Sequence, residues 1–215
     1  MNRAFIFDMD GVLVNSEHAW TTLEEPMLRR VLGAEIAEKF GNTIGIGLIG
    51  VIKRAAQYDP NFDKDALIQG YEDTAVDVYA QSPITSGVEA LAQKLLSLGF
   101  KLGLVTQSPQ TWIDQVVPRL PFKESLEAII SLNDRKDLRE KPAPDGYQEA
   151  LRLLGASAER SIVLEDSNFG IMAAKAAGAF TIGYRGNLVD GYEQTGADEY
   201  ADTMEEVGRI VATRP

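Results

Sequence analysis

Short apolar runs alternate with helical patterns along most of this 215-residue chain. The first run, residues 4–7, is uninterrupted, and a short continuous apolar run predicts a parallel strand that is buried on both faces. Between residues 15 and 80 only helical spacing occurs, whereas strand-like and helical segments alternate from residue 81 onward. The expected strands are 4–7, 100–105, 128–131, 161–164 and 180–183, and the expected helices are 16–32, 34–40, 51–58, 63–79, 88–98, 110–117, 145–154, 168–177 and 204–212.

This order of elements predicts an α/β fold with a Rossmann-like, doubly wound parallel sheet, because alternating strands and helices form parallel sheets covered on both faces. The all-helical block is then an insertion after the first strand. We expect a discontinuous core of residues 1–14 and 81–215 and a helical cap domain of residues 15–80, with hinges near 14–15 and 81–82. Pro26 is expected to kink the first helix or to divide it in two.

The composition narrows the possible partners of the protein. A net charge of −11 disfavours nucleic acid and membrane surfaces, because both are anionic. The lack of cysteine excludes disulfides and thiolate chemistry, and the single histidine, His18, excludes histidine-rich metal sites. No apolar run has the length of a membrane span or of a signal peptide, so we expect a cytoplasmic protein acting on a small molecule. Since no large apolar surface stretch is evident, we expect a monomer.

Polar side chains follow four of the predicted strands, at the edge of the sheet where ligands of open α/β folds bind. Taken singly, each has a structural explanation, since Asp, Ser and Thr cap helices or close turns and a loop lysine is usually solvated. Their convergence at one edge of one sheet indicates a functional site instead. The residues are Asp8 and Asp10; Thr106 with Gln107 and Ser108; Lys141; and Glu165 with Asp166.

The turn after the first strand is an acidic cation site with a candidate nucleophile. Asp8 and Asp10 are separated by one residue, and carboxylates at the end of a buried strand are costly unless they are paired or bound to a cation. Gly11 lets the backbone turn tightly and approach a ligand closely. A calcium loop of the EF-hand type is excluded by spacing, because Ala19 stands where its bidentate glutamate is required.

A glycine-rich segment in the helical block imitates a nucleotide-binding motif. Gly45, Gly47 and Gly50 match the spacing of the dinucleotide fingerprint, G-x-G-x-x-G. That motif should follow a strand, and the preceding residues have helical character instead. We therefore interpret residues 41–50 as a flexible loop of the cap that lies over the site.

These motifs resemble those of the haloacid dehalogenase superfamily of hydrolases, in the group with a small helical cap. The resemblance covers nearly the whole chain and is carried by DMDGV, the threonine after the second strand, KPAPD, and EDSxxGxxAAxAAG over residues 165–178. It implies that Asp8 attacks phosphorus and that Asp10 serves as general acid and base. Asn15 departs from the family, which most often has an aspartate there.

The chemistry implied by the resemblance requires a cation, because the oxygens of a phosphoryl group repel an incoming carboxylate. Mg²⁺ cancels that repulsion, orients in-line attack and prefers hard oxygen ligands. The expected ligands are Asp8, the backbone carbonyl of Asp10, Asp166 and Glu165. Thr106 and Lys141 are expected to hold the phosphate and to take part in catalysis. Further phosphate or substrate contacts are expected from Gly11, Trp20, Asn42, Gln107 and Ser108.

The resemblance favours a phosphatase that hydrolyses a small phosphorylated metabolite, with a sugar phosphate as the expected substrate class. Asp10 argues against dehalogenases and phosphonate hydrolases, which lack an acid there. A β-phosphoglucomutase-type enzyme stays an alternative, although Trp20 occupies the position of its cap histidine and His18 lies two residues early. A non-enzymatic protein that binds a phosphorylated metabolite is the alternative of another class. In the cap, Thr43 is a further polar candidate, whereas Lys53 and Arg54 have the character of solvated helix residues.

Substitution of the two aspartates tests these roles. Asp8→Asn should abolish turnover because the amide is not a nucleophile, whereas Asp10→Asn should lower it by about 10² to 10⁴, the usual contribution of general acid–base catalysis. The measurement is phosphate release by purified variants. An Asp8→Asn variant with near-normal turnover would refute the nucleophile assignment.

Overall fold

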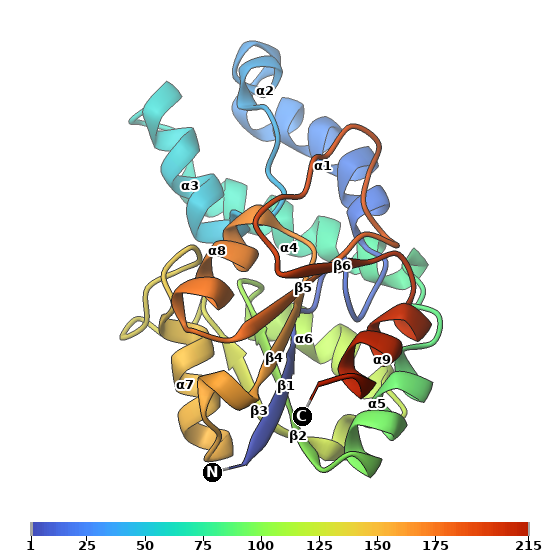
Figure 1. Cartoon of the computed structure of the whole chain (residues 1–215). Coiled ribbons are helices and arrows are strands. Elements are labelled where there is room, and N and C mark those ends of the chain that lie inside the picture. The colour runs from blue at the N-terminus through green and yellow to red at the C-terminus, as the bar shows by residue number, and fades with distance from the viewer. Residues whose placement is uncertain (1, 215) are drawn as a thin grey trace.

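A six-stranded parallel sheet forms the centre of the computed structural model, which describes residues 2–214 (Figure 1). The strand order is β3-β2-β1-β4-β5-β6. β1 lies in the middle, where it pairs with β2 on one side and β4 on the other, as its apolar sequence predicts. The strands are β1 (Arg3–Phe7), β2 (Phe100–Thr106), β3 (Leu126–Ser131), β4 (Ile162–Glu165), β5 (Phe180–Tyr184) and β6 (Glu199–Ala201).

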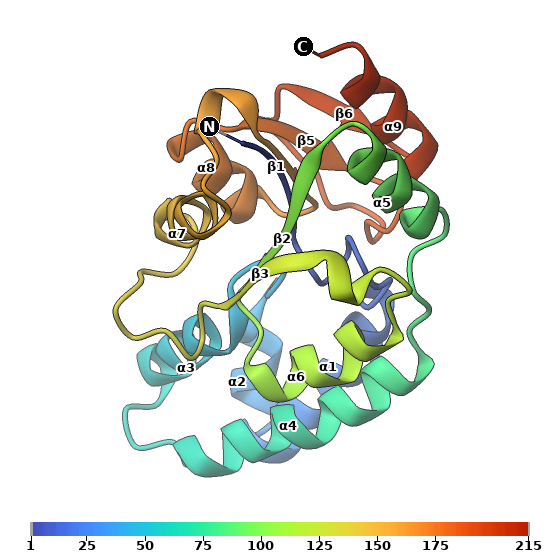
Figure 2. The same cartoon turned by 90° about the horizontal axis from the view of Figure 1, so that it is seen from below.

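Helices cover both faces of the sheet (Figures 1 and 2), and side chains of β1 belong to both of the apolar clusters. Successive side chains of a strand point to opposite faces. Phe5 and Phe7 therefore pack in the cluster with α5 (Val88–Ser97) and α9 (Met204–Ala212), while Ala4 and Ile6 pack with α7 (Asp145–Leu154) and α8 (Asn168–Ala176). The remaining core elements are α6 (Gln110–Val116) and the 3₁₀ turns η1 (Val117–Arg119), η2 (Lys123–Ser125) and η3 (Ala158–Arg160).

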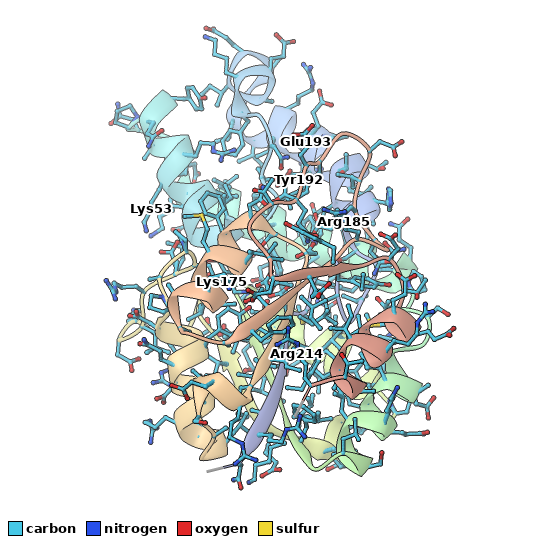
Figure 3. The ribbon with its side chains drawn as sticks, viewed as in Figure 1. Lys53, Lys175, Arg185, Tyr192, Glu193 and Arg214 are labelled. Atoms are coloured by element: carbon cyan, nitrogen blue, oxygen red, sulfur yellow. The ribbon has the colours of Figure 1, made fainter. Side chains whose placement is uncertain are left out.

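Four helices between β1 and α5 form the predicted helical insertion, which lies over the carboxyl ends of the strands in Figure 1. They are α1 (Glu17–Leu32), α2 (Ala34–Phe40), α3 (Gly47–Tyr58) and α4 (Lys64–Gln81). The two chain segments that connect insertion and core lie side by side, because Val14 forms an antiparallel bridge with Ile84. Figure 3 marks Lys53 on α3, whose Nζ lies 2.8 Å from a carboxylate oxygen of Glu140 in the core.

Three elements differ from the predictions. β6 was not predicted, because three residues with an exposed Glu199 carry no strand pattern. α3 begins at Gly47 rather than at residue 51, so the glycine-rich segment is shorter than expected. Of the two outcomes predicted for Pro26, division of the first helix is wrong, since α1 continues through it, and a kink there stays a prediction. Proline has no N–H, so the carbonyl of Thr22 loses its helical hydrogen-bond donor. Both residues lie on the exposed face of α1, where water can solvate that carbonyl.

No helix within residues 2–214 combines the length and apolar character that crossing a membrane requires.

The central strands should carry the stability of the core. Leu102 of β2 is fully buried, so Leu102→Ala should lower the free energy of unfolding by about 2–5 kcal/mol through lost packing and a residual cavity. Leu96→Ala is the matched control, since that side chain on α5 is 41% exposed, and it should cost less than about 1 kcal/mol. Denaturant unfolding of both variants measures the difference; equal losses would contradict this description of the core.

Candidate active site

The predicted site residues converge on one cavity between the carboxyl ends of the strands and the helical insertion. Its volume is about 630 Å³, within the usual range for small-molecule sites. Two of the predicted residues, Gly11 and Glu165, are not among those that line it. The lining includes Asp8, Asp10, Trp20, Asn42, Thr106, Gln107, Ser108, Lys141 and Asp166.

Lys141 holds the candidate nucleophile in place. Its Nζ lies 2.5 Å from Oδ1 of Asp8 and 2.6 Å from Oε1 of Glu165, and it also donates to the Val105 carbonyl at 3.2 Å. Burial by itself lowers the pKa of Lys141, but the charges of Asp8 and Glu165 outweigh it and raise the pKa above its usual value. Lys141 is therefore a fixed cation at this site.

Asp8, Glu165 and Asp166 form a buried acidic group suited to a metal ion. One carboxylate oxygen of each lies within 4.8 Å of the others. Oδ2 of Asp166 is buried and has no hydrogen-bond partner among residues 2–214, so it is free to bind a cation. Burial raises the pKa of Asp8 to about 8 and that of Asp166 well above its usual value, and neighbouring carboxylates add to both. Hard carboxylate oxygens in this arrangement fit Mg²⁺.

Glu165 is the most heavily hydrogen-bonded member of this group. Besides Lys141, it accepts from the hydroxyl of Tyr147 at 2.5 Å and from the backbone N–H and hydroxyl of Ser167 at 3.2 and 3.1 Å. It is completely buried. These contacts fix Glu165 as the support of Lys141. Its expected role as a direct metal ligand, like that of the Asp10 carbonyl, stays a prediction.

Asp10 is anchored by hydroxyl groups from both parts of the molecule. Its Oδ1 accepts from Ser16 at 2.7 Å and from Tyr79 of α4 at 2.9 Å, and its Oδ2 accepts from Ser108 of the core at 2.7 Å. Sequence reasoning missed Ser16 and Tyr79 as partners, because Tyr79 lies 69 residues from Asp10 in the chain. The candidate acid and base thus lies at the junction of cap and core.

The loop after β2 supplies polar groups next to Asp8. The Thr106 hydroxyl oxygen accepts from the N–H of Ser108 at 3.0 Å, and the carbonyl of Ser108 accepts from Ser131 at 2.8 Å. The side-chain amide of Gln107 donates to the carbonyl of Gly45 in the insertion. These bonds give the loop a fixed shape and connect it to the insertion.

The glycine-rich segment lies over the site, as expected, and follows helix α2 rather than a strand. A Cβ on Gly45 would lie 2.7 Å from Cβ of Ser167, and one on Gly47 would lie 2.7 Å from Cβ of Gln107. Both glycines also have positive φ values, of 74° and 60°. The glycines therefore allow the insertion to approach the core closely, which explains the spacing without a nucleotide.

The predicted cap residues have differing environments. Trp20 lines the cavity and packs against Trp112, with ring centroids 4.9 Å apart. Asn42 also lines the cavity, but its Oδ1 accepts from the N–H of Ile44 at 2.7 Å and so stabilises a turn. Arg54 donates to the carbonyls of Phe40 and Asn42. His18 is exposed and does not line the cavity.

Glu17 is the most conspicuous residue that sequence reasoning missed. It lies at the start of α1, is only 8% exposed, lines the cavity and has no hydrogen-bond partner for its carboxylate among residues 2–214. Burial, then the charges of Asp10 and Asp8, raise its pKa to about 8. The available signal was its place seven residues after Asp10, at the start of the first cap helix.

The loop between β5 and β6 also reaches the cavity, through Val189 and Asp190. Figure 3 marks Tyr192 and Glu193 in this loop, which runs beside the insertion. The hydroxyl of Tyr192 accepts from the N–H of Asn168 at 2.8 Å and so ties the loop to the start of α8. No local motif marks this loop, so the sequence did not indicate it.

Comparison with known proteins agrees with this geometry. The chain is 29% identical over 199 residues to the validoxylamine A 7′-phosphate phosphatase of Streptomyces hygroscopicus subsp. limoneus, with 85% of each chain covered. It is 27% identical over 179 residues to hexitol phosphatase B of Escherichia coli K12, covering 81% of this chain and 79% of that protein. A hydrolase from Pseudomonas syringae has a similar fold, with a TM-score of 0.82, 18% identity and 99% of each chain covered.

A family model described as haloacid dehalogenase-like hydrolase matches residues 5–184. The match begins within β1 and extends to the end of β5, so it includes the aspartate motif, the helical insertion, Lys141 and the acidic pair after β4. The resemblance drawn from the sequence motifs is thereby confirmed, and the chain belongs to the haloacid dehalogenase-like hydrolase family.

Proposed function

We propose that the protein is a Mg²⁺-dependent phosphatase that hydrolyses a small phosphorylated metabolite, of the sugar-phosphate class, through a covalent aspartyl phosphate on Asp8. The observation that carries the proposal is the placement of Asp8 in the cavity between the fixed cation of Lys141 and the carboxylate of Asp166. The names of the relatives support a small phosphorylated substrate, since one is a validoxylamine A 7′-phosphate phosphatase and another is a hexitol phosphatase.

In the first step, an oxygen of Asp8 forms a bond to phosphorus and the ester bond to the leaving alcohol breaks. Asp10 gives its proton to the departing oxygen. In the second step, water attacks phosphorus, the bond between phosphorus and Asp8 breaks, and Asp10 takes the proton of that water. The phosphate leaves, and both carboxyls return to their starting state.

The surrounding groups neutralise and position the phosphoryl group. Lys141 orients Asp8 and offsets negative charge on a phosphoryl oxygen, while the hydroxyl of Thr106 offers a hydrogen bond. Asp8 and Asp166 would hold Mg²⁺, with Glu165 and the Asp10 carbonyl as the further expected ligands. When bound, Mg²⁺ supplies positive charge that lowers the repulsion between the carboxylate and the phosphate.

The helical insertion serves as the cap of this site in our proposal. Residues 15–80 form the cap domain and residues 1–14 and 81–215 the catalytic core. Contacts of Gln107 with Gly45 and of Asp10 with Tyr79 join the two parts over the cavity. Closure of the cap excludes bulk water during the first transfer, which protects the reactive intermediate. The expected monomeric state stays a prediction.

Phosphate release from a panel of substrates tests the proposal. The panel contains hexose and hexitol phosphates, phosphoglycolate and an aryl phosphate, each assayed with Mg²⁺ and then with EDTA. We expect release with Mg²⁺, greatest for a few sugar or polyol phosphates, and loss of at least about 90% of it with EDTA because the acidic site is left without its cation.

If the folded protein releases no phosphate from any compound in the presence of Mg²⁺, the phosphatase proposal is wrong and the metabolite-binding alternative is favoured. Conversion of β-glucose 1-phosphate to glucose 6-phosphate, without free phosphate, would show the mutase instead.

Gly11 offers a structural test of the metal site. A Cβ at this position would lie 2.0 Å from Oδ2 of Asp166, the unpartnered oxygen of the proposed site. Gly11→Ala should therefore lower Mg²⁺-dependent kcat/KM by at least about tenfold, equivalent to 1.4 kcal/mol, and weaken Mg²⁺ binding measured by calorimetry.

Gly33→Ala is the matched control. Gly33 has a similar positive φ of 86°, compared with 69° for Gly11, but a Cβ there meets nothing within 4 Å. It should cost about 1–2 kcal/mol of stability from backbone strain while leaving Mg²⁺ affinity intact. Equal effects of the two substitutions on Mg²⁺ binding would contradict the site.

A further inference from the structure

The charge of the cavity outside the reaction centre is almost entirely negative. Five further carboxylates line it: Glu17, Glu24, Glu25, Glu38 and Asp190. Among the lining residues in the described part of the chain, Lys141 is the one cation, and it is committed to Asp8 and Glu165. The cavity therefore offers positive charge to a phosphoryl group at Asp8 and offers none to a second anionic group.

The nearest cap cations are used elsewhere. Lys53 pairs with Glu140 in the core, and Arg54 donates to backbone carbonyls of the cap. Arg29 pairs with Glu25 and Glu38 at the rim, which reduces the charge of those two carboxylates. None of the three cations lines the cavity, so Glu17, Glu24 and Asp190 have no cation of the cap as an ion-pair partner.

Glu17 is the carboxylate with the clearest relation to a ligand. It is more than nine-tenths buried, lines the cavity beside Asp10 and accepts no hydrogen bond from residues 2–214. A buried polar group without a partner is unfavourable, and a hydroxyl group of a ligand would satisfy it. A carboxyl group accepts a hydrogen bond from a hydroxyl in either protonation state, whereas an anion has no proton to offer.

Glu24 differs from Glu17 in being satisfied by the protein. Its two oxygens accept from the hydroxyls of Tyr71, at 2.5 Å, and Thr43, at 2.6 Å. These bonds fix the Glu24 side chain as part of the cavity wall. Glu17 is thus the open acceptor, and Glu24 already has its partners within the protein.

The remaining wall is apolar and aromatic. Trp20, Tyr71 and Trp112 pack together, with the Trp20 and Tyr71 ring centroids 5.9 Å apart and those of Tyr71 and Trp112 6.4 Å apart. Leu48 and Val51 of α3 add aliphatic surface. Such a wall accommodates the C–H faces of a carbon skeleton, while its neighbouring carboxylates accept from hydroxyl groups.

We propose, on the basis of the proposed phosphatase function, that the substrate is the monophosphate of a neutral polyhydroxylated compound, that one of its hydroxyls donates to Glu17, and that the acidic cavity rejects substrates with a second anionic group. Sugar bisphosphates and phosphorylated sugar acids are the rejected classes. A bisphosphate intermediate of the kind that phosphomutases bind falls among them, so the same charge argument disfavours the mutase.

The test compares glucitol 6-phosphate with gluconate 6-phosphate, which share the carbon skeleton and phosphate and differ in a terminal hydroxymethyl or carboxylate group. With the unmodified protein and Mg²⁺, kcat/KM should be at least about tenfold higher for glucitol 6-phosphate. Equal values would overturn the charge selection, while the observed turnover would leave the phosphatase function standing. No turnover of either compound, or of an aryl phosphate, would overturn both.

Glu17→Gln tests whether Glu17 is responsible for the preference for glucitol 6-phosphate. The amide keeps the shape of the side chain, cannot ionise and donates to a carboxylate, so the ratio of the two kcat/KM values should fall by at least about fivefold. Glu35→Gln is the control, since Glu35 lies on the exposed surface of the cap, pairs with Lys39 and does not line the cavity. It should leave the ratio unchanged.

A Glu17→Gln protein with the unmodified ratio would overturn the role of Glu17. Thermal unfolding of both variants shows whether they are folded. Inhibition of the unmodified protein by the free products gives a measure that does not depend on a variant: glucitol should bind more tightly than gluconate, and the reverse order would contradict the proposal.

Discussion

The buried ammonium of Lys141 is the interaction on which the arrangement of the site depends. It joins Asp8, at the end of β1, to Glu165, at the end of β4, and an unpaired charge at this depth would cost several kcal/mol. With Asp166 beside them, three carboxylates share one ammonium. The excess negative charge is what a divalent cation would compensate. The pairing that holds the nucleophile therefore also creates the demand for a metal.

Cap and core are coupled at the reaction centre itself. Asp10 belongs to the core, yet Ser16 and Tyr79 at the two ends of the helical insertion donate to it. A displacement of the cap would therefore remove donors from the candidate acid and base at the same time as it opened the cavity. The hydrogen bond from Gln107 to the carbonyl of Gly45 would also be lost if the cap were displaced. In our proposal, water exclusion and proton transfer would therefore depend on the same closed arrangement.

The parts of the fold that local pattern determines could be predicted from the sequence. Buried strands such as β1 are apolar without interruption, and the four sets of polar residues follow strands whose ends must meet. β6 could not be predicted, since its three residues owe their conformation to pairing with β5. Tyr79 and Glu17 could not be identified as site residues, because only the folded chain brings them close to Asp10. Gly45 and Gly47 show the converse, because a glycine spacing typical of nucleotide loops here serves close packing of cap on core.

In our proposal, the core recognises the charged phosphoryl group and the cap recognises the neutral part of the substrate. The core concentrates one fixed cation and a proposed metal at a single point, which suffices for one phosphoryl group. The cap supplies carboxylates, hydroxyls and aromatic rings, and none of its described residues that line the cavity is a cation. Because electrostatic interactions strengthen in a site closed to water, the difference between a neutral and an anionic substrate should be greatest when the cap is closed. The closure that we propose to protect the aspartyl phosphate would then also strengthen this selection between neutral and anionic substrates.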